Sequence, residues 1–270
     1  AISQNVGIDL RAWNDKISLT FDVFKNSRED ILTQPLLTLP EYSGITPPRI
    51  NVGEFENTGY EFTLGFNGGN EDFNYNLQFN FSNTNNKLVF FDEATLADRP
   101  WQRQTGGEIG RPLLWKFDGV FRNQAEIDAE TLDYSEVAPI LRPGDARVVD
   151  ISGDGAIGPE DRTRVGGSPF ADTQFGWNTS MSYKNLDFTM YWAGATGGWS
   201  RYEWSFMSGT LANVQRDVRD RAWSLDNPNA YGPRLADRGD QWYSNNTDAY
   251  MITRDFFRLK NLEIGYSFDP

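Results

Sequence analysis

Residues 72–82 alternate strictly between large apolar and polar side chains. The apolar positions are Phe73, Tyr75, Leu77, Phe79 and Phe81, and the polar residues between them include Asn74, Asn76, Gln78 and Asn80. Because successive side chains of a β-strand point to opposite faces, this period of two predicts a strand with one apolar and one polar face. The pattern recurs and predicts seven strands near residues 5–13, 16–26, 57–67, 72–84, 173–183, 186–194 and 257–268.

The connections between these strands are alternately short and long. Asn14-Asp15, residues 68–71 and Lys184-Asn185 form tight turns, whereas the long connections are predicted at residues 27–56, 85–172 and 195–256. Compact soluble domains rarely carry several loops of that length. Transmembrane β-barrels have short periplasmic turns and long extracellular loops. We therefore predict an all-β fold, an antiparallel transmembrane β-barrel segment.

Strand length and aromatic placement agree with a membrane barrel. A tilted membrane-spanning strand needs about 9–11 residues. Aromatic residues flank the short turns, where an interfacial girdle would lie: Trp13, Phe66, Phe73 and Tyr183. Single-chain barrels have at least about 8 strands, so we expect seven to be part of a larger barrel. The alternative from pattern alone is a secreted β-sandwich, whose strands also alternate.

Composition excludes several classes of function. The chain has no Cys and no His, which excludes disulfides, thiol catalysis, Ser-His-Asp catalysis and His-ligated metals. A net charge of −13 argues against a nucleic-acid partner. Mean hydropathy is −0.58, and no apolar run approaches the ~20 residues of a membrane-spanning helix. We predict that the chain is not an enzyme and has no organic cofactor.

An acidic, glycine-rich segment at residues 150–161 has the spacing of an EF-hand-type calcium loop. Gly155 stands at position 6, where such a loop turns sharply. The predicted oxygen ligands are Asp150, Ser152, Asp154, the Ala156 carbonyl and Asp161. Ser at position 3 and Asp at position 12 both weaken ligation, and the alternative is a solvated turn without metal. A calcium ion here would have a structural role.

Six tryptophans fall in the predicted long loops: Trp101, Trp115, Trp199, Trp204, Trp223 and Trp242. Loop aromatics more often fill a small core or an interface than stack on a ligand. We take Trp199, Trp204, Trp223 and Trp242 as candidates for contact with a substrate or partner.

Six segments, in order, resemble motifs of the SusC/RagA-type TonB-linked outer-membrane proteins. The segment 51–62 resembles "NxGxxxNxGxE", and 110–121 resembles "GxP…DGIF". Residues 150–169 are similar to "DxNGDGxIxxxDRxxxG…P", with Ser152 in place of Asn. The remaining three are similar to "YKNFDL" at 183–187, "RWT…DNPNA" at 221–230 and "LRLKNLTLGY" at 258–266.

This resemblance implies the C-terminal part of a 22-stranded barrel, without the plug domain and the final strands. It further implies import of glycan oligosaccharides or peptides across the outer membrane of Bacteroidota. The implied partners are a SusD-like surface lipoprotein that closes over the barrel, the TonB complex acting through the plug, and outer-membrane lipid.

Two other functions compete with this expectation. One is a secreted, calcium-dependent carbohydrate-binding β-protein or adhesin. The other is a glycoside hydrolase, although no pair of carboxylates has a spacing that singles it out. The sequence does not reveal a substrate.

Overall fold

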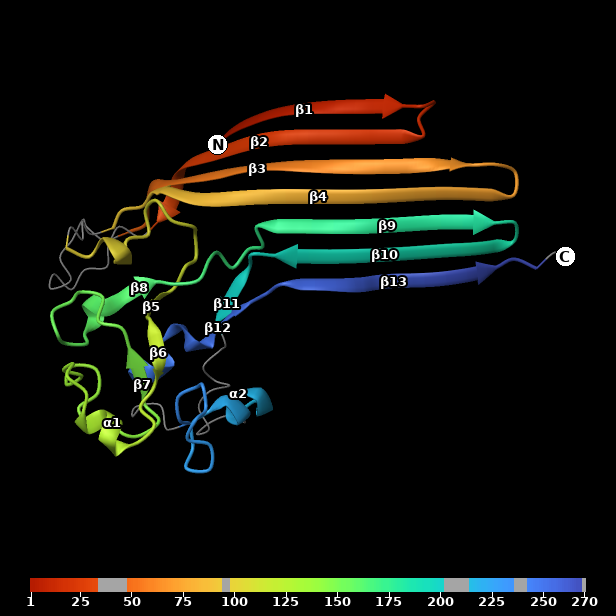
Figure 1. Ribbon diagram of the computed structural model, residues 1–270. Coiled ribbons are helices and arrows are strands. Elements are labelled where there is room, and N and C mark those ends of the chain that lie inside the picture. Colours follow the sequence, from red (N-terminus) through yellow and green to blue (C-terminus); the bar gives the residue numbers. More distant parts are fainter. Residues whose placement is uncertain (34–47, 94–97, 202–213, 236–241, 269–270) are drawn as a thin grey trace.

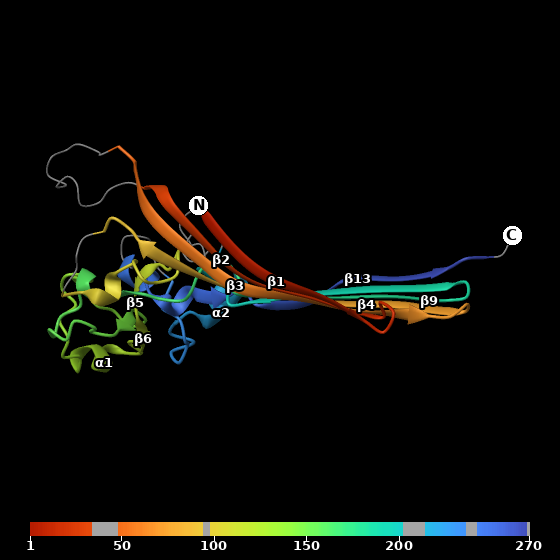
Figure 2. The ribbon, with the colours of Figure 1, turned by 90° about the horizontal axis from the view of Figure 1, so that it is seen from above.

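The computed structural model describes residues 1–33, 48–93, 98–201, 214–235 and 242–268. One antiparallel sheet of seven strands dominates it, and both views show long, curved strands (Figures 1 and 2). In spatial order the strands are β1 (Ile2–Ala12), β2 (Ile17–Thr33), β3 (Ile50–Gly69), β4 (Phe73–Phe90), β9 (Thr173–Tyr183), β10 (Leu186–Thr196) and β13 (Phe256–Tyr266). The predicted fold class, an antiparallel barrel segment, is confirmed.

Three tight turns lie together at one end of the sheet (Figure 1). The β9–β10 hairpin has a two-residue loop in which Lys184 adopts φ 52°, the left-handed conformation that such tight loops require. Between β3 and β4, the Asn70 side chain accepts hydrogen bonds from the backbone N–H groups of Asp72 and Phe73. The long connections leave from the opposite end.

Strands β2, β3 and β4 extend further toward the long-loop end than the alternation predicted. β2 continues to Thr33, β3 begins at Ile50 and β4 reaches Phe90. The extension is irregular, with register shifts around Ile31 and a left-handed Asp30 at φ 57°. The β2–β3 connection therefore spans 34–49 instead of 27–56.

Parts of the other two long connections form a second folded unit, the loop domain, comprising the described residues of 91–172 and 197–255. Three small antiparallel pairs organise it: β5 (Leu113–Trp115) with β8 (Arg162–Arg164), β6 (Phe117–Val120) with β7 (Ala146–Val148), and β11 (Trp199–Arg201) with β12 (Met251–Thr253). Its helices are α1 (Gln124–Asp128), α2 (Arg216–Arg221), α3 (Trp242–Asn245) and the 3-10 turns η2 (Pro100–Gln102), η3 (Pro159–Asp161) and η5 (Asp248–Tyr250). No helix in the described parts of the chain is long and apolar enough to cross a membrane.

The main hydrophobic core lies in the loop domain and not on the sheet. It consists of Trp115, Phe121, Tyr134, Ala138, Ala146, Val148, Ile157 and Tyr243. Segments more than a hundred residues apart meet there, because Tyr243 lies beside Tyr134 with ring centroids 6.1 Å apart. These residues come from both long connections, so the loops fold as one body.

Candidate functional site

Strand register places the predicted apolar residues side by side on one face of the sheet. One row crosses all seven strands: Leu10, Leu19, Leu64, Phe79, Trp177, Trp192 and Leu259. The adjacent row toward the long loops is Ile8, Phe21, Phe62, Phe81, Phe175, Gly194 and Phe257. The alternation in sequence therefore becomes a continuous apolar surface in space.

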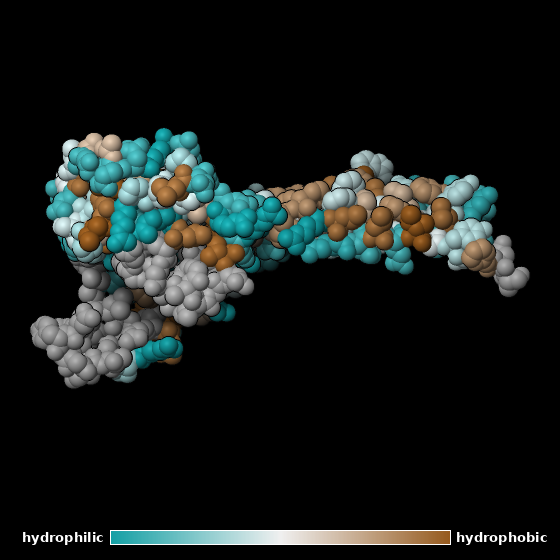
Figure 3. All heavy atoms as spheres, turned by 90° about the horizontal axis from the view of Figure 1, so that it is seen from below, coloured by the Kyte–Doolittle hydropathy of each residue, from teal (hydrophilic) through white to brown (hydrophobic). Residues whose placement is uncertain are grey.

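We call this surface the apolar belt. Six such rows, each two residues from the next along the strands, run from the row of Phe73, Tyr183, Leu186 and Tyr266 to the row of Val6, Val23 and Tyr60. Many of its side chains are exposed even on inner strands, including Val23 at 48% and Trp177 at 47%. Figure 3 shows hydrophobic side chains following the strands, with hydrophilic ones beside them. So much exposed apolar area needs an apolar partner.

The opposite face of the sheet is polar. One of its rows is Arg11, Ser18, Gly65, Gln78, Asn178, Tyr191 and Asn261, and the next includes Asp9, Thr20, Thr63 and Asn80. Asp9 accepts a hydrogen bond from the Thr20 hydroxyl at 2.7 Å. This polar face carries amide, hydroxyl and charged groups, as a water-filled barrel interior does.

The loop domain packs on the polar side at the far end of β4. Leu88 and Asn86 point to that side and are buried. The backbone of Leu88 exchanges hydrogen bonds with Gly106 and Gly107 at 2.7 and 2.9 Å. The Asn86 side chain accepts from the N–H of Ile109 at 2.8 Å. The loop domain is thus anchored over the polar face, away from the apolar belt.

In the acidic loop at 150–161, the carboxylates bind the loop's own backbone. Asp150 accepts from the N–H groups of Gly153 at 2.6 Å and Gly155 at 3.0 Å, and from the Ser152 hydroxyl at 3.1 Å. Burial raises the pKa of Asp150, but these hydrogen bonds outweigh it and hold the pKa below its ordinary value. Asp154 accepts from the N–H of Ala156 at 2.9 Å.

Asp161, the predicted ligand at position 12, is fully buried. It accepts from the N–H groups of Ile151 at 3.0 Å, Ser152 at 2.9 Å and Gly158 at 2.8 Å, and so ties both ends of the loop together. Within the described residues, no three Asp, Glu, His or Cys side chains form a group that could hold a metal ion. Calcium at this loop therefore stays a prediction from the sequence.

Ile157, at position 8 of the loop, is fully buried in the core of the loop domain. Its N–H donates to the Asp133 carbonyl at 2.7 Å, and the Asp133 N–H donates to the Gly155 carbonyl at 3.0 Å. The Trp115 indole N–H donates to the Gly158 carbonyl at 2.9 Å. The acidic loop is therefore a structural corner of the loop domain.

The described tryptophans of the predicted long connections lie within the loop domain. Trp115 is fully buried, and Arg162 lies over its ring at 5.3 Å. Trp101 donates to the Glu160 carbonyl at 2.8 Å, and Trp223 donates to the Arg122 carbonyl at 3.2 Å. Trp199 is half-buried in β11. The structure thus gives Trp199 and Trp223 packing positions within the loop domain.

Two of the candidate contact tryptophans cannot be placed in this way. Trp204 lies outside the described residues, and of Trp242 only the backbone, at the start of α3, is described. Contact of Trp199, Trp204, Trp223 or Trp242 with a substrate or partner stays a prediction.

A buried ion pair joins the two long connections, and the sequence did not single it out. Arg234 Nε lies 2.8 Å from Asp145 Oδ1, and the Asp145 side chain is 1% exposed. The Tyr243 hydroxyl donates to the Ala146 carbonyl at 2.9 Å, and the Ser244 hydroxyl accepts from the Ala146 N–H at 3.0 Å. These groups are about 90–100 residues apart in the sequence and meet only in the folded chain. No pattern in the local sequence therefore reveals them.

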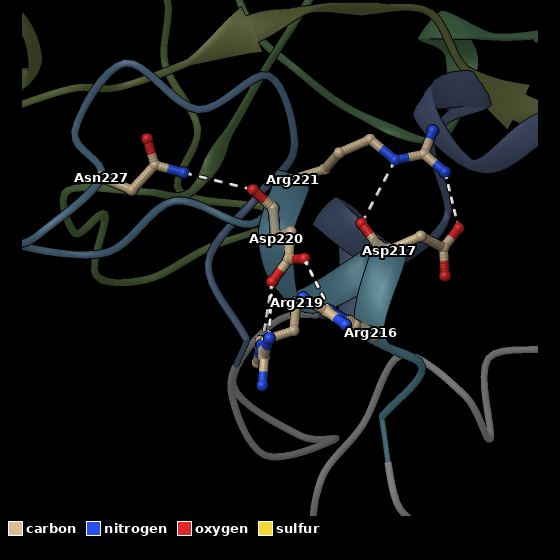
Figure 4. A network of polar contacts seen from close by, with 6 residues as sticks. All are labelled: Arg216, Asp217, Arg219, Asp220, Arg221 and Asn227. Carbon is tan, nitrogen blue, oxygen red and sulfur yellow. Dashed lines mark hydrogen bonds and ion pairs between the residues drawn. The ribbon is translucent and has the colours of Figure 1, made fainter.

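The surface of the loop domain at α2 carries a network of ion pairs (Figure 4). Asp220 lies between Arg219, at 2.8 Å, and Arg216, at 3.5 Å. Arg221 reaches Asp217 at 2.7 Å, and the Asn227 amide donates to the Asp220 carbonyl at 3.3 Å. All three arginine–aspartate pairs are largely exposed, so we expect them to add little to stability.

Tyr231 is an exposed aromatic in the loop domain, at 67% exposure. Its ring meets that of Phe117 edge-on, with centroids 5.5 Å apart. It borders a polar cleft of about 340 Å³ that also contains Asp118, Arg122 and Arg147. This cleft was not foreseen from the sequence.

Comparison with known proteins agrees with this geometry. No protein-family model matches the chain. The chain is 33% identical to TonB-dependent receptor P3 of Formosa agariphila, over 97% of the chain and 26% of the relative. It is 23% identical to TonB-dependent receptor SusC of Bacteroides thetaiotaomicron, over 98% of the chain and 25% of the relative.

Solved structures share the fold. The RagAB peptide transporter superposes with a TM-score of 0.69 at 20% identity, covering 98% of the chain and 28% of that protein. The RagAB peptide importer in its open-open state gives a TM-score of 0.67 at 18% identity, with the same coverage. The chain spans about a quarter of the length of the curated relatives it matches. The chain belongs to the SusC/RagA-type TonB-dependent receptors and corresponds to part of their β-barrel.

Proposed function

We propose that this chain forms part of the wall and the extracellular rim of an outer-membrane importer. In this proposal the full receptor takes up nutrients, glycan oligosaccharides or peptides, through TonB-dependent transport. The observation that carries the proposal is the apolar belt, because it crosses all seven strands without a break.

The height of the apolar belt supports a position in a membrane. On β4 the belt fills five rows, from Phe73 to Phe81, separated by four steps of two residues, which at about 3.4 Å per residue is about 27 Å along the strand. Barrel strands are tilted by about 40°, so these rows would stand about 21 Å tall. That is close to the apolar band of about 25 Å on outer-membrane barrels. A secreted carbohydrate-binding protein would have no use for such a belt.

The polar face and the loop domain would then have separate roles. Gln78, Asn80 and Asn178 would face the barrel interior, where water and a plug domain satisfy them. The loop domain, anchored over this face through Leu88 and Asn86, would form part of the rim at the extracellular mouth. The rim is where a substrate and a surface lipoprotein would first meet the receptor.

The partners follow from the same proposal. A SusD-like surface lipoprotein would close over the rim, and the TonB complex would act through a plug elsewhere in the full receptor. Support comes from the relative named SusC and from the solved RagAB structures. We propose no catalytic role for the chain.

Calcium is part of the proposal only as a structural ion at residues 150–161. Asp150, Ser152, Asp154, Asp161 and the Ala156 carbonyl would hold it. As the loop is folded here, three of these carboxylates are engaged with backbone N–H groups. Calcium binding would require Asp161 to release some of the backbone N–H groups that donate to it.

Fractionation and growth test the proposed function. The full-length receptor should sediment with outer membranes and show a heat-dependent shift in gel mobility. Deleting its gene should impair growth on a glycan or a peptide mixture as sole source, and re-expression should restore it. A receptor that stays in the soluble fraction would contradict the proposal.

A further inference from the structure

A broad groove crosses β1 to β4 on the outward face, at the edge of the apolar belt nearest the loop domain. Its volume is about 890 Å³. Its side chains form two neighbouring rows: Val6, Val23, Tyr60 and Asn83, and then Gln4, Lys25, Thr58 and Asn85. The floor between the rows includes the backbone of Phe24 and Gly59. The groove therefore has an apolar border and a polar border.

Three of the four side chains on the polar border, those of Gln4, Thr58 and Asn85, have no side-chain hydrogen bond within the described residues. Lys25 Nζ binds Glu56 at 2.6 Å, and the Lys25 side chain stays 49% exposed.

Lys87 adds a positive charge beside this border. It stands one outward position beyond Asn85 on β4, directly opposite Glu56 on β3. It is exposed and has no ion pair within the described residues. Lys25, Glu56 and Lys87 therefore leave one net positive charge next to the amide and hydroxyl donors. Such a set suits a phosphate surrounded by hydroxyl groups.

The apolar border continues into the apolar belt. Val6 and Val23 are exposed at 76% and 48%, and Ile8 and Phe21 follow them in the next row. Tyr60 stacks on Phe81, which stands in the next row of the belt, with centroids 5.9 Å apart. An acyl chain descending from the groove along β1 and β2 would meet the apolar pairs Ile8 with Phe21 and Leu10 with Leu19.

We propose that this groove binds a glycolipid of the outer leaflet, with its phosphorylated headgroup on the polar border and an acyl chain along Val6, Val23 and Ile8. The inference rests on the proposed function, because the groove lies at the outer leaflet only if the long loops are extracellular. Continuity with the belt and the charge of Lys25 and Lys87 favour a lipid over a protein partner. Glu56 tunes the site, since it competes with the phosphate for Lys25.

Native mass spectrometry on the full-length receptor tests this, with monophosphoryl lipid A and its dephosphorylated form as probes. The double variant Lys25→Gln/Lys87→Gln should lower the affinity for the phosphorylated probe about tenfold. Glu56→Gln should raise it, because Lys25 is then free for the phosphate. Lys116→Gln, an exposed lysine of the loop domain, should change nothing. A general folding defect cannot produce shifts of opposite sign.

The outcomes separate this inference from the proposed function. The proposed glycolipid site would be overturned if the wild type bound both probes with equal affinity. It would also be overturned if the double variant and the wild type bound the phosphorylated probe equally well. Either result in a receptor that fractionates with outer membranes leaves the importer proposal standing. A wild type absent from the outer membrane would instead overturn both.

Discussion

Arg234 Nε lies 2.8 Å from Asp145 Oδ1, although 89 residues separate them. Asp145 is almost completely buried, and Arg234 is 16% exposed. Asp145 also accepts from the N–H of Arg142 at 2.8 Å, so both of its oxygens are engaged. This pair fixes the second long connection of the loop domain to the first, beside the aromatic core.

Asp145→Asn should therefore loosen the loop domain while leaving the sheet intact. Asparagine keeps the shape of the Asp145 side chain but removes the charge that pairs with Arg234, and breaking a buried ion pair costs about 3–5 kcal/mol. Hydrogen exchange on the full-length receptor should show faster exchange at residues 142–148 and 232–235, and unchanged exchange in β2 to β4. The control is Asp118→Asn, since the Asp118–Arg147 pair is 59% and 41% exposed and should contribute little. Equal effects of the two changes would contradict this assignment.

Phe79→Arg and Gln78→Arg test which face meets lipid. Phe79 stands in the fourth of six rows of the apolar belt, near its middle, whereas Gln78 is on the polar face. A lipid-facing Arg near the midplane costs about 2–4 kcal/mol. Phe79→Arg should sharply lower the amount of heat-modifiable receptor in the outer membrane, and Gln78→Arg should not. The same substitution at adjacent positions removes any effect of charge alone.

Buried tyrosines should make the loop domain sensitive to alkali. Burial raises the pKa of Tyr134 to about 12, and that of Tyr250 to about 12 as well. Burial, with the nearby charge of Asp145, also raises the pKa of Tyr243. The folded state holds these protons more tightly than the unfolded state. The buried tyrosines therefore contribute fully to the stability of the loop domain below pH 10, and this contribution is lost as the pH rises toward 12.

Tyrosinate absorbance and near-UV circular dichroism measure this transition. We expect loss of loop-domain tertiary signal between pH 10 and 12, together with tyrosinate formation. Tyr231→Phe is the control, because Tyr231 is exposed and removal of its hydroxyl should leave the loss of tertiary signal unchanged. Ionisation of all tyrosines without loss of tertiary signal would contradict the prediction.

The long strands were predictable because each carries its own evidence in the local sequence. Alternation such as Phe79-Asn80-Phe81 requires only that one face of the sheet is apolar and the other is polar. The apolar belt and the polar face provide these two environments. Beyond it, the outward residues Lys25, Thr58 and Asn85 are polar too, so the alternation disappears while the backbone ladder continues. The ends of β2, β3 and β4 could not be seen for that reason.

The loop domain was not predictable because distant contacts hold its short elements. β6 has four residues and α1 has five, too few to show a period. In the acidic loop, the spacing of Asp150 and Asp161 correctly indicated a sharply turning loop. It did not reveal their partners, because a carboxylate can accept a backbone N–H as readily as it can ligate a cation.

Thr179→Val should be neutral or stabilising. Thr179 stands in the apolar belt between Leu77 and Met190, is 3% exposed, and its hydroxyl has no hydrogen-bond partner within the described structure. Replacing an unsatisfied buried hydroxyl by a methyl group of similar shape removes a desolvation cost of about 1–3 kcal/mol. The temperature at which heat-modifiability is lost should stay the same or rise. A fall would mean that the hydroxyl has a partner in the assembled barrel.

Asp161→Ala and Asp154→Ala separate the two roles available to the acidic loop. Asp161→Ala leaves three N–H groups without an acceptor and should destabilise the loop domain by about 2–4 kcal/mol, with or without calcium. Asp154 accepts from one exposed N–H, so Asp154→Ala should change little in a chelator. If calcium binds as the sequence predicts, it raises the melting temperature of the wild type, and Asp154→Ala abolishes that rise. No rise in the wild type would refute the calcium site, and the effect of Asp161→Ala would then identify this carboxylate as the internal substitute for the ion.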